Sequence, residues 1–515
     1  MSNLDRRQFL KVSAAVAAVT SSGSSMAQTN GTPPAALAAA AAAATPAVAA
    51  PAAAASAAAA STAAASAAVP KVTRILAQYI VGARYEDLPA SVRKEGARTL
   101  LNWVGVAVGG SHHETVECAV AALGPFSGPQ QATLLGRKER FDIMNAAFVN
   151  GVSSHIFDYD DTHLKTIIHP GGPVISAILA LSEYRPVSGR DFMNALILGV
   201  ETELRIGNAV YPNHYDVGWH ITGTAGVFGA AAAAGKLLGL SEQQMVWALG
   251  LAASQPVGLR ESFGSMNKSF NPGRAASNGL FAAILAAQNY TSSDGMIEAK
   301  RGWANTISTK QDYREITEGL GTRYEASLNT YKPFACGIVI HPAIDAAIQL
   351  RNQYHLTAEQ IDHIELRVHP LVIELTGKKT PQIGLEGKFS VYHSVAVAIV
   401  AGAAGEKQYS DAAVRDPATI ALRDRVSATI DPAIKSEQVD MTIVLKDGRK
   451  LHRFIEHAIG STQVPMTDQQ LEIKFSDLVD GILPKAQSVN LVNLCWNIEK
   501  QPSANIIAQT GARLI

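Results

Sequence analysis

The sequence predicts a mostly α-helical protein, with a large all-α domain followed by a smaller α+β domain. Alanine is abundant and aromatic residues make up only 6% of the chain, which favours close-packed helices over a β-sandwich. Helical apolar spacing runs through the first part, whereas strand alternation and a hairpin turn appear after about residue 326. At 515 residues the chain is too long for one ordinary core, so two folded domains are expected.

The first 70 residues are predicted to form an export signal followed by a linker. A twin arginine at positions 6–7 precedes a short apolar run and the small-x-small cleavage site Ser25-Met26-Ala27, which resembles a twin-arginine export signal. Residues 1–27 are therefore predicted to engage the export machinery and direct the protein to the periplasm, with the signal cleaved or kept as an inner-membrane anchor; a disordered basic N-terminus is the alternative. Residues 28–70 are nearly all Ala, Ser, Thr, Pro and Gly, and they predict a disordered linker because they have almost nothing to bury.

Residues 71–325 are predicted to form the all-α domain. Helices are expected over Val92–Val108, Asn145–His155, Val174–Leu181, Thr224–Leu238 and Glu242–Ala253. Pro173 suits the first position of the third of these helices, and Gly239 should end the fourth. Ser241 and Gln244 form a capping box that opens the fifth.

Residues 326–470 are predicted to form the smaller α+β domain. Ile364–Val368 alternates like a strand, and Asp447-Gly448 between two short apolar runs is a strong hairpin signal. Residues 471–515 have helical character again and are expected to pack back on the first domain.

Bulk composition excludes some classes of partner and site. The formal net charge is zero, so no global charge argument favours nucleic acid, and none is expected as a partner. The three cysteines, Cys118, Cys336 and Cys495, are too few and too scattered for a disulfide framework or a zinc site. They are expected to be buried small apolar residues.

The densest chemistry lies in Asn150–His169, which reads NGVSSHIFDYDDTHLKTIIH. Acids and imidazoles crowded this closely are costly to desolvate, so a chain rarely gathers them for packing alone. His169 could move a proton near neutral pH, with a carboxylate such as Asp158 or Asp161 orienting the ring; Thr162 lies between them. A network of capping aspartates at a helix end and a metal site remain as alternatives.

Cations gather in a second segment, Gly218–Gly279. His220 directly precedes a glycine- and threonine-rich helix start, where free amide groups favour a carboxylate. Lys268 could stabilise a carboxylate or a developing enolate, and Arg260 or Arg274 could clamp a carboxylate with two hydrogen bonds. Solvated surface cations are the alternative interpretation.

Weaker candidates occur at and within the smaller domain. Lys332 stands in KPFACG, and Tyr392 and His393 stand in GKFSVYHS. Their position suits side chains that reach across a cleft between two domains, although a surface or core role is the simpler interpretation of each alone.

Taken together, these segments resemble the MmgE/PrpD family, which includes 2-methylcitrate dehydratase, cis-aconitate decarboxylase and iminodisuccinate epimerase. The resemblance covers about residues 72–515 and rests on NGVSSHIFDYDDTH, HPGGPVISAILALSE, GWHITGTAGVFGAAAAAGKLLGL, GSMNKSFNPGRAASNGL, YKPFACGIVIHPAIDA and GKFSVYHS. It implies a large all-α domain with a smaller α+β lid, a homodimer, and no organic cofactor or obligatory metal. The catalytic residues that it implies are Asp158, Asp161, Thr162, His169, His220, Lys268 and Lys332.

Three positions depart from the family pattern. His163 stands where the dehydratase and decarboxylase branches often have tryptophan, and Asn271 where many members have histidine. His393 aligns with a tyrosine of the decarboxylase branch, and Tyr392 lies one position earlier. Because an altered acid/base group changes which bond is broken, these departures bear on the substrate more than on the fold.

The sequence therefore predicts a cofactor-independent lyase, a dehydratase or decarboxylase, that acts on a small di- or tricarboxylate through α-proton transfer and an enediolate-like intermediate. Arg260, Arg274, Tyr392 and His393 are expected to bind the substrate. One alternative is an epimerase or racemase of an iminodisuccinate-like compound. Another is a periplasmic carboxylate-binding protein without turnover.

Overall fold

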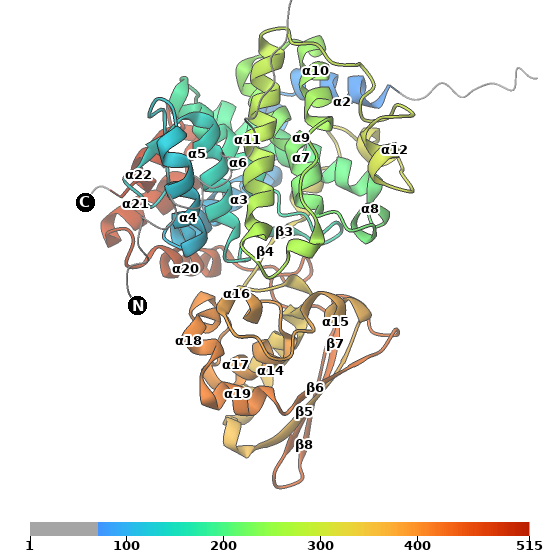
Figure 1. Cartoon of the computed structure of the whole chain (residues 1–515), viewed down its shortest axis with the longest axis vertical. Helices are drawn as coiled ribbons and strands as arrows, with labels where there is room; N and C mark the ends of the chain where they lie inside the picture. Colours follow the sequence, from blue (N-terminus) through green and yellow to red (C-terminus); the bar gives the residue numbers. More distant parts are fainter. Residues whose placement is uncertain (1–70, 514–515) are drawn as a thin grey trace, which may run out of the picture. The chain divides into compact units, whose positions relative to one another are not determined.

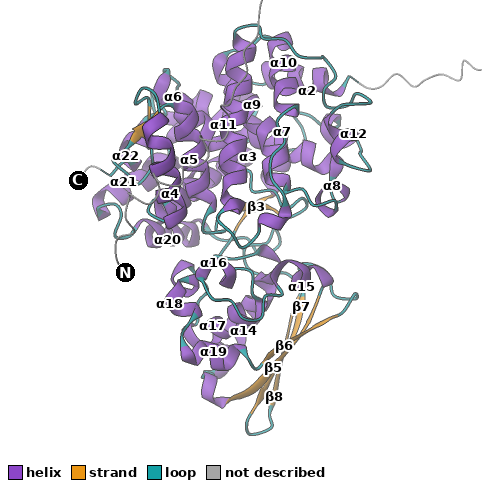
Figure 2. Cartoon of the chain, viewed as in Figure 1, coloured by secondary structure: helices purple, strands orange, loops and turns teal. Residues whose placement is uncertain are grey.

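Helices make up most of residues 71–513, the part of the chain that the computed structural model describes (Figure 1). These residues belong to one folded unit, and the predicted signal peptide (1–27) and linker (28–70) lie outside the described residues. A large helical body and a small sheet-containing region confirm the mostly α fold (Figure 2).

The helical body begins at Val72 and contains twelve α-helices among the described residues. They are α2 (Val72–Gly82), α3 (Ala90–Gly110), α4 (Glu114–Leu123), α5 (Ile143–His155), α6 (Gly171–Tyr184), α7 (Gly189–Val210), α8 (Asn213–Asp216), α9 (Ile221–Leu238), α10 (Glu242–Ala253), α11 (Asn267–Ala287), α12 (Trp303–Ile307) and α13 (Arg314–Thr317). Two short strands, β1 (Ala132–Thr133) and β2 (Arg140–Phe141), pair antiparallel between α4 and α5.

Small residues let the central helices of the body approach closely. A Cβ on Gly279 of α11 would lie 2.4 Å from the Cβ of Ala230 in α9, so that contact requires glycine. Likewise, a Cβ on Gly151 of α5 would lie 2.6 Å from the Cα of Gly273 in α11. Among the described residues α9 is the helix whose length and composition would suit a membrane span, but 83% of it is buried, as in a core helix.

The smaller region contains a four-stranded sheet in the order β6-β5-β7-β8. Its elements are α14 (His341–Tyr354), β5 (Ile361–Val368), α15 (Pro370–Thr376), α16 (Gly384–Gly387), α17 (Val391–Ala401), α18 (Asp411–Val414), α19 (Pro417–Arg423), β6 (Val426–Ile430), β7 (Val439–Leu445) and β8 (Lys450–Ile455). β5 pairs parallel with β6 and antiparallel with β7, and β7 and β8 form the predicted hairpin. Ile364 and Leu366 are buried in one cluster with side chains of α14 and α17, so these helices cover one sheet face.

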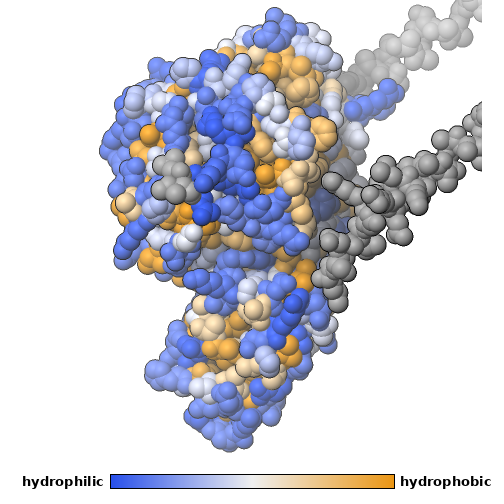
Figure 3. All heavy atoms as spheres, turned by 60° about the vertical axis from the view of Figure 1, so that its left-hand side comes forward, coloured by the Kyte–Doolittle hydropathy of each residue, from blue (hydrophilic) through white to orange (hydrophobic). Residues whose placement is uncertain are grey.

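Three C-terminal helices return to the body: α20 (Asp468–Val479), α21 (Lys485–Trp496) and α22 (Ile506–Gly511) (Figure 1). The ring of Phe475 in α20 lies so close to Gly105 of α3 that a Cβ there would approach it to 2.9 Å. On the face shown in Figure 3, hydrophilic residues dominate the body and apolar residues form scattered groups, as expected for a chain of balanced charge.

The structure corrects two details of the predicted elements. α6 begins at Gly171, so Pro173 is its third residue and not its first; the Asp161 carboxylate accepts a hydrogen bond from the Gly171 amide (3.0 Å) and supplies the helix start. The pairing of β3 (Asp161–His163) with β4 (Asn329–Tyr331) was not predicted, because strands of three residues show no alternation. This ribbon joins the segment of the acids to the segment of Lys332.

Candidate active site

A small cavity of about 30 Å³ lies where the helical body meets the smaller region. Its titratable side chains are those of Asp158, His169, Tyr215, His220, Lys268 and Lys332. Five of the seven predicted catalytic residues are therefore brought to one space from positions up to 174 residues apart. Ile167, Phe263, Val339, Leu375 and Phe389 supply apolar walls.

Asp158 is the centre of a buried cluster of charges. Its Oδ1 accepts hydrogen bonds from Lys332 Nζ (2.6 Å) and Lys268 Nζ (2.8 Å). Lys332 Nζ also donates to the Asp158 main-chain oxygen (3.0 Å). Burial would raise the pKa of Asp158, but the two ammonium groups outweigh burial and hold its pKa well below the usual range. One carboxylate thus faces two cations, which leaves positive charge for an anionic ligand.

His169 is held in one orientation just before α6. Its Nδ1 lies 2.9 Å from the Asp161 main-chain oxygen and 3.1 Å from Thr162 Oγ1. Because a carbonyl oxygen only accepts, Nδ1 carries the proton and Nε2 keeps the lone pair. The geometry therefore presents Nε2 as a base.

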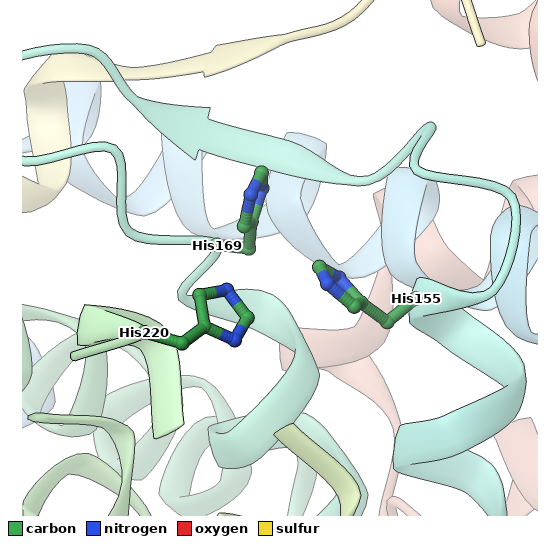
Figure 4. A group of neighbouring side chains, drawn as sticks. All are labelled: His155, His169 and His220. Carbon is green, nitrogen blue, oxygen red and sulfur yellow. The ribbon is translucent and has the colours of Figure 1, made fainter. Parts of the chain in front are cut away.

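Three imidazoles lie around a common space: His155 at the end of α5, His169, and His220 at the start of α9 (Figure 4). One ring nitrogen of each lies within 4.8 Å of the others. Burial, reinforced by the positive charge of Lys268, lowers the pKa of all three well below the ordinary value. All three rings are therefore neutral near pH 7.

His155 and Asp160 are functional candidates that the sequence analysis did not single out. His155 Nδ1 and Asp160 Oδ2 are 2.6 Å apart, and Asp160 Oδ1 lies 3.6 Å from His169 Nδ1. The buried Asp160 carboxylate thus orients His155 and places its charge beside His169, and among the described residues His155 Nε2 has no hydrogen-bond partner. Both residues stood in the dense acid and imidazole segment, but nothing in their spacing distinguished them from their neighbours.

The three histidines could geometrically supply nitrogen ligands to a metal ion. The charges nearby oppose that use, because Lys268 and Lys332 line the same cavity and both already bind the Asp158 carboxylate. A divalent cation would meet two ammonium groups at close range. The arrangement suits an anion better than a metal.

Asp161 and Thr162 lie directly behind the cavity and not in its wall. Asp161 Oδ2 accepts hydrogen bonds from Asn329 Nδ2 (2.7 Å) and from the Gly171 amide, so it fixes the β3–β4 ribbon to the start of α6. Burial and the charge of Asp160 raise the pKa of Asp161 to about 7. Both residues therefore contact His169, through the Asp161 main-chain oxygen and Thr162 Oγ1, and not the cavity.

The structure does not bring the four predicted substrate-binding residues into the cavity wall. Arg274 is exposed on α11, and Tyr392 and His393 are buried in α17, where His393 Nε2 contacts the Gln408 main-chain oxygen (3.0 Å). Arg260 lies one layer away, with its guanidinium 4.2 Å from the ring centroid of Tyr215, and it binds Glu374. The GKFS segment contributes Phe389 to the cavity in place of Tyr392 and His393.

The positions that depart from the family pattern have defined surroundings. His163 points into the helical body, with Nδ1 2.8 Å from Thr166 Oγ1 and Nε2 3.4 Å from the Glu325 carboxylate. This contact, above all, lowers the pKa of Glu325 to about 2. Asn271 Nδ2 donates to His220 Nδ1 (2.8 Å), so the amide stands directly behind a cavity imidazole. Of the three cysteines, Cys336 and Cys495 are buried as expected, whereas Cys118 is exposed.

Fold and site together indicate an enzyme, because a mostly α-helical fold gathers titratable side chains around one cavity. Models of the MmgE/PrpD N-terminal and C-terminal domains match residues 74–316 and 334–498, so the chain belongs to the MmgE/PrpD family. It is 25% identical to cis-aconitate decarboxylase of Aspergillus terreus over 463 residues, which cover 83% of this chain and 93% of the relative.

Two further relatives extend this comparison. The human cis-aconitate decarboxylase is 24% identical over 458 residues, covering 85% of this chain and 93% of the relative. The 2-methylcitrate dehydratase of Cupriavidus necator is 24% identical over 362 residues, covering 64% and 74%. A twin-arginine translocation signal model matches residues 3–23, which supports the predicted export.

Proposed function

We propose that the chain is a cofactor-independent lyase, a dehydratase or decarboxylase, acting on a small di- or tricarboxylate. The observation that carries the proposal is the neutral imidazole of His169, held with Nε2 free, in the wall of a cavity that also presents the ammonium groups of Lys268 and Lys332. A base beside two cations suits removal of a proton α to a carboxylate. The matched relatives named as a decarboxylase and a dehydratase support lyase chemistry.

In the dehydratase form, the two lysines bind a substrate carboxylate and His169 Nε2 takes the α-proton. The electron pair of the broken C–H bond moves into the carboxylate to give an enediolate, which the ammonium charges stabilise. The pair then returns to form the C=C bond as the C–O bond of the β-hydroxyl breaks. The neutral His220 donates its Nε2 proton to the departing hydroxide and water leaves; the proton taken up by His169 then replaces the one lost from His220.

In the decarboxylase form, the C–C bond to one carboxylate breaks and carbon dioxide leaves. The electron pair stays on the carbon chain and takes a proton from an imidazole N–H, and solvent water then returns a proton to that ring. With Asn271 donating to Nδ1, His220 keeps its own proton on Nε2, which fits this donor role. Both forms use the same cations, so the substrate decides which bond breaks.

An epimerase of an iminodisuccinate-like substrate is the second candidate, because three neutral imidazoles surround one space and could return a proton to either face of the enediolate. A carboxylate-binding protein without turnover is the third. It would use the same cations but has no need of a free imidazole base.

Proton NMR in D₂O with a panel of small di- and tricarboxylates and iminodisuccinate tests the proposal. A lyase removes substrate signals and produces an alkene or a decarboxylated product. Deuterium incorporation without net elimination indicates the epimerase. Ligand-induced shifts with no chemical change for any compound would contradict both enzymes and leave the binding protein. The variant His169→Gln serves as the inactive control.

We further propose that the exported enzyme works in the periplasm as a homodimer. The twin-arginine signal supports export, and membership of the family supports the dimer. Fractionation of cells and light scattering of the purified protein test the two statements separately. Retention of the protein in the inner membrane would indicate an uncleaved anchor.

A further inference from the structure

Two buried lysines outside the cavity wall bind the main chain on both sides of the charged pair Asp158 and Lys332. Lys474 of α20 donates to the main-chain oxygens of Tyr159 (2.6 Å) and Lys332 (2.9 Å). Lys388, next to α16, donates to the main-chain oxygens of Phe157 (2.8 Å) and Ala335 (3.0 Å). Each ammonium therefore joins the acid-bearing segment to the Lys332 segment.

These bonds surround a backbone that needs support. Asp158 has a φ of 49°, in the left-handed region that residues other than glycine seldom adopt. Its neighbours on either side, Phe157 and Tyr159, are the residues whose carbonyls the two lysines bind. Such conformations persist only where the surrounding structure fixes them, and they gather at functional sites.

The third hydrogen-bond partner of each ammonium group shows how the buried charge is accommodated. Lys474 Nζ donates to Asn102 Oδ1 (2.8 Å), and it lies 3.9 Å from the ring centroid of Tyr159. Its three hydrogen bonds all go to neutral oxygens. Lys388 instead pairs with the Glu406 carboxylate. Burying an ammonium is costly, so an apolar side chain would serve better if packing were the only requirement.

We propose that Lys388 and Lys474 are positioning residues that hold Asp158 and Lys332 in register for catalysis. Neither touches the substrate; Lys388 acts from the smaller region and Lys474 from the C-terminal segment. The two lysines thus connect three separate parts of the chain at one charged pair. The catalytic half of this inference rests on the lyase proposed above, whereas the structural half does not.

The chain offers a matched control in Lys236. Its Nζ also bridges two main-chain oxygens, those of Val81 (2.7 Å) and Ala83 (2.7 Å), at the end of α2. None of these three residues lines the cavity. Lys236→Met removes the same kind of bond from a place where no catalytic group depends on it.

The test compares Lys388→Met and Lys474→Met with Lys236→Met. Amide hydrogen exchange should rise in residues 157–161 and 332–336 for the first two variants and stay unchanged there for the third. With a substrate identified, kcat should fall about a hundredfold for the first two variants, because misplacing a reacting group by about 1 Å has that order of effect. KM should change little, since the cavity cations remain.

Each result decides something. If amide exchange in both segments stays at the wild-type rate, the two lysines do not hold these segments in place and the proposal is wrong, whether or not any carboxylate is turned over. Raised exchange with wild-type kcat confines the lysines to a structural role and overturns positioning. Raised exchange with no turnover in the wild type refutes the lyase and upholds the structural half of the inference. If a methionine variant does not fold, Lys474→Gln or Lys388→Gln takes its place under the same criteria.

Discussion

The two faces of the cavity are built from different kinds of residue. The helical body supplies the titratable side chains Asp158, His169, His220 and Lys268, whereas the smaller region supplies Val339, Leu375, Thr376 and Phe389, and Lys332 lies at the junction. The titratable groups thus come from one part of the chain, which also contributes Ile167 and Phe263 to the apolar wall, whereas the smaller region contributes shape alone. Changes on the first face should alter the rate of the reaction, and changes on the second should alter which substrate is accepted.

The largest effect should come from the body face. His169→Gln removes the base, and we expect kcat to fall about 10²- to 10⁴-fold, the usual contribution of a positioned general base. His214→Gln is the matched control, because His214 is buried like His169 but lies outside the cavity wall. The two ring nitrogens of His214 contact the Ile307 main-chain oxygen and Thr224 Oγ1. Equal losses in the two variants would show that burial, and not catalysis, explains the effect.

The pH profile of kcat/KM should be broad, because its acid and alkaline limbs are set by His169 and Lys268 of the helical body. Burial lowers the pKa of His169 well below 6.5, and a base works when deprotonated, so kcat/KM should hold steady as pH falls through 6.5 and decline only well below it. Burial also lowers the pKa of Lys268 from 10.5, so the alkaline decline should begin below that value as the cation is lost. Initial rates in constant-ionic-strength buffers measure both limbs. A midpoint near 6.5 would contradict a buried neutral base.

Stability should respond to acid for the same reason. The folded protein keeps three histidines neutral, while the unfolded chain protonates them near pH 6.5. At these three positions the unfolded state then binds more protons, so they lower the free energy of unfolding as pH drops below 6.5, whereas Asp161, whose pKa the fold raises to about 7, contributes in the opposite direction. Urea denaturation at several pH values measures this, and His155→Gln should reduce the slope between pH 6.5 and 5. An unchanged slope in that variant would show that His155 is not among the groups responsible.

The smaller region should yield a medium effect of another kind. The Phe389 ring lies 5.9 Å from that of Phe263 and 5.5 Å from Lys268 Nζ, so it closes the cavity beside a substrate-binding cation. Phe389→Ala should enlarge the cavity and shift the ratio of kcat/KM between a small and a larger carboxylate by roughly tenfold, with kcat for the original substrate little changed. The exposed Phe126→Ala is the control. A loss of kcat without altered selectivity would show that Phe389 contributes to the rate and not to substrate choice, and would contradict the proposed division between the two faces.

The sequence predicted the parts of this arrangement that are encoded locally. Capping boxes, the Asp447-Gly448 hairpin and the crowded acids near Asp158 follow from neighbouring residues, and the structure contains all three features. The hydrogen bonds of Lys474 to the main chain join it to residues 142 and 315 positions away, so no local spacing of residues in the sequence could predict them. The same holds for the pairing of β3 with β4, which brings Lys332 to the acids.

The cations of α11 show how a local signal can also mislead. The sequence predicted that Lys268 would take part in catalysis and Arg274 in substrate binding, so both were expected at one site. Six positions along a helix amount to roughly one and two-thirds turns, however, so they emerge on different faces. Lys268 enters the cavity and Arg274 is exposed. Tyr392 and His393 likewise lie outside the cavity wall, and the same motif reaches the cavity through Phe389.

Arg274→Ala should therefore have the smallest effect. We expect kcat and KM within about twofold of the wild type, because exposed substitutions away from caps and networks usually change little. Lys268→Met, from the same helix, should raise KM and lower kcat together, since its ammonium binds the substrate and stabilises the intermediate. A tenfold loss in folded Arg274→Ala would place that guanidinium in substrate binding after all. Such a result would mean that the catalytic face extends beyond the cavity wall, around α11, and would break the division between the two faces.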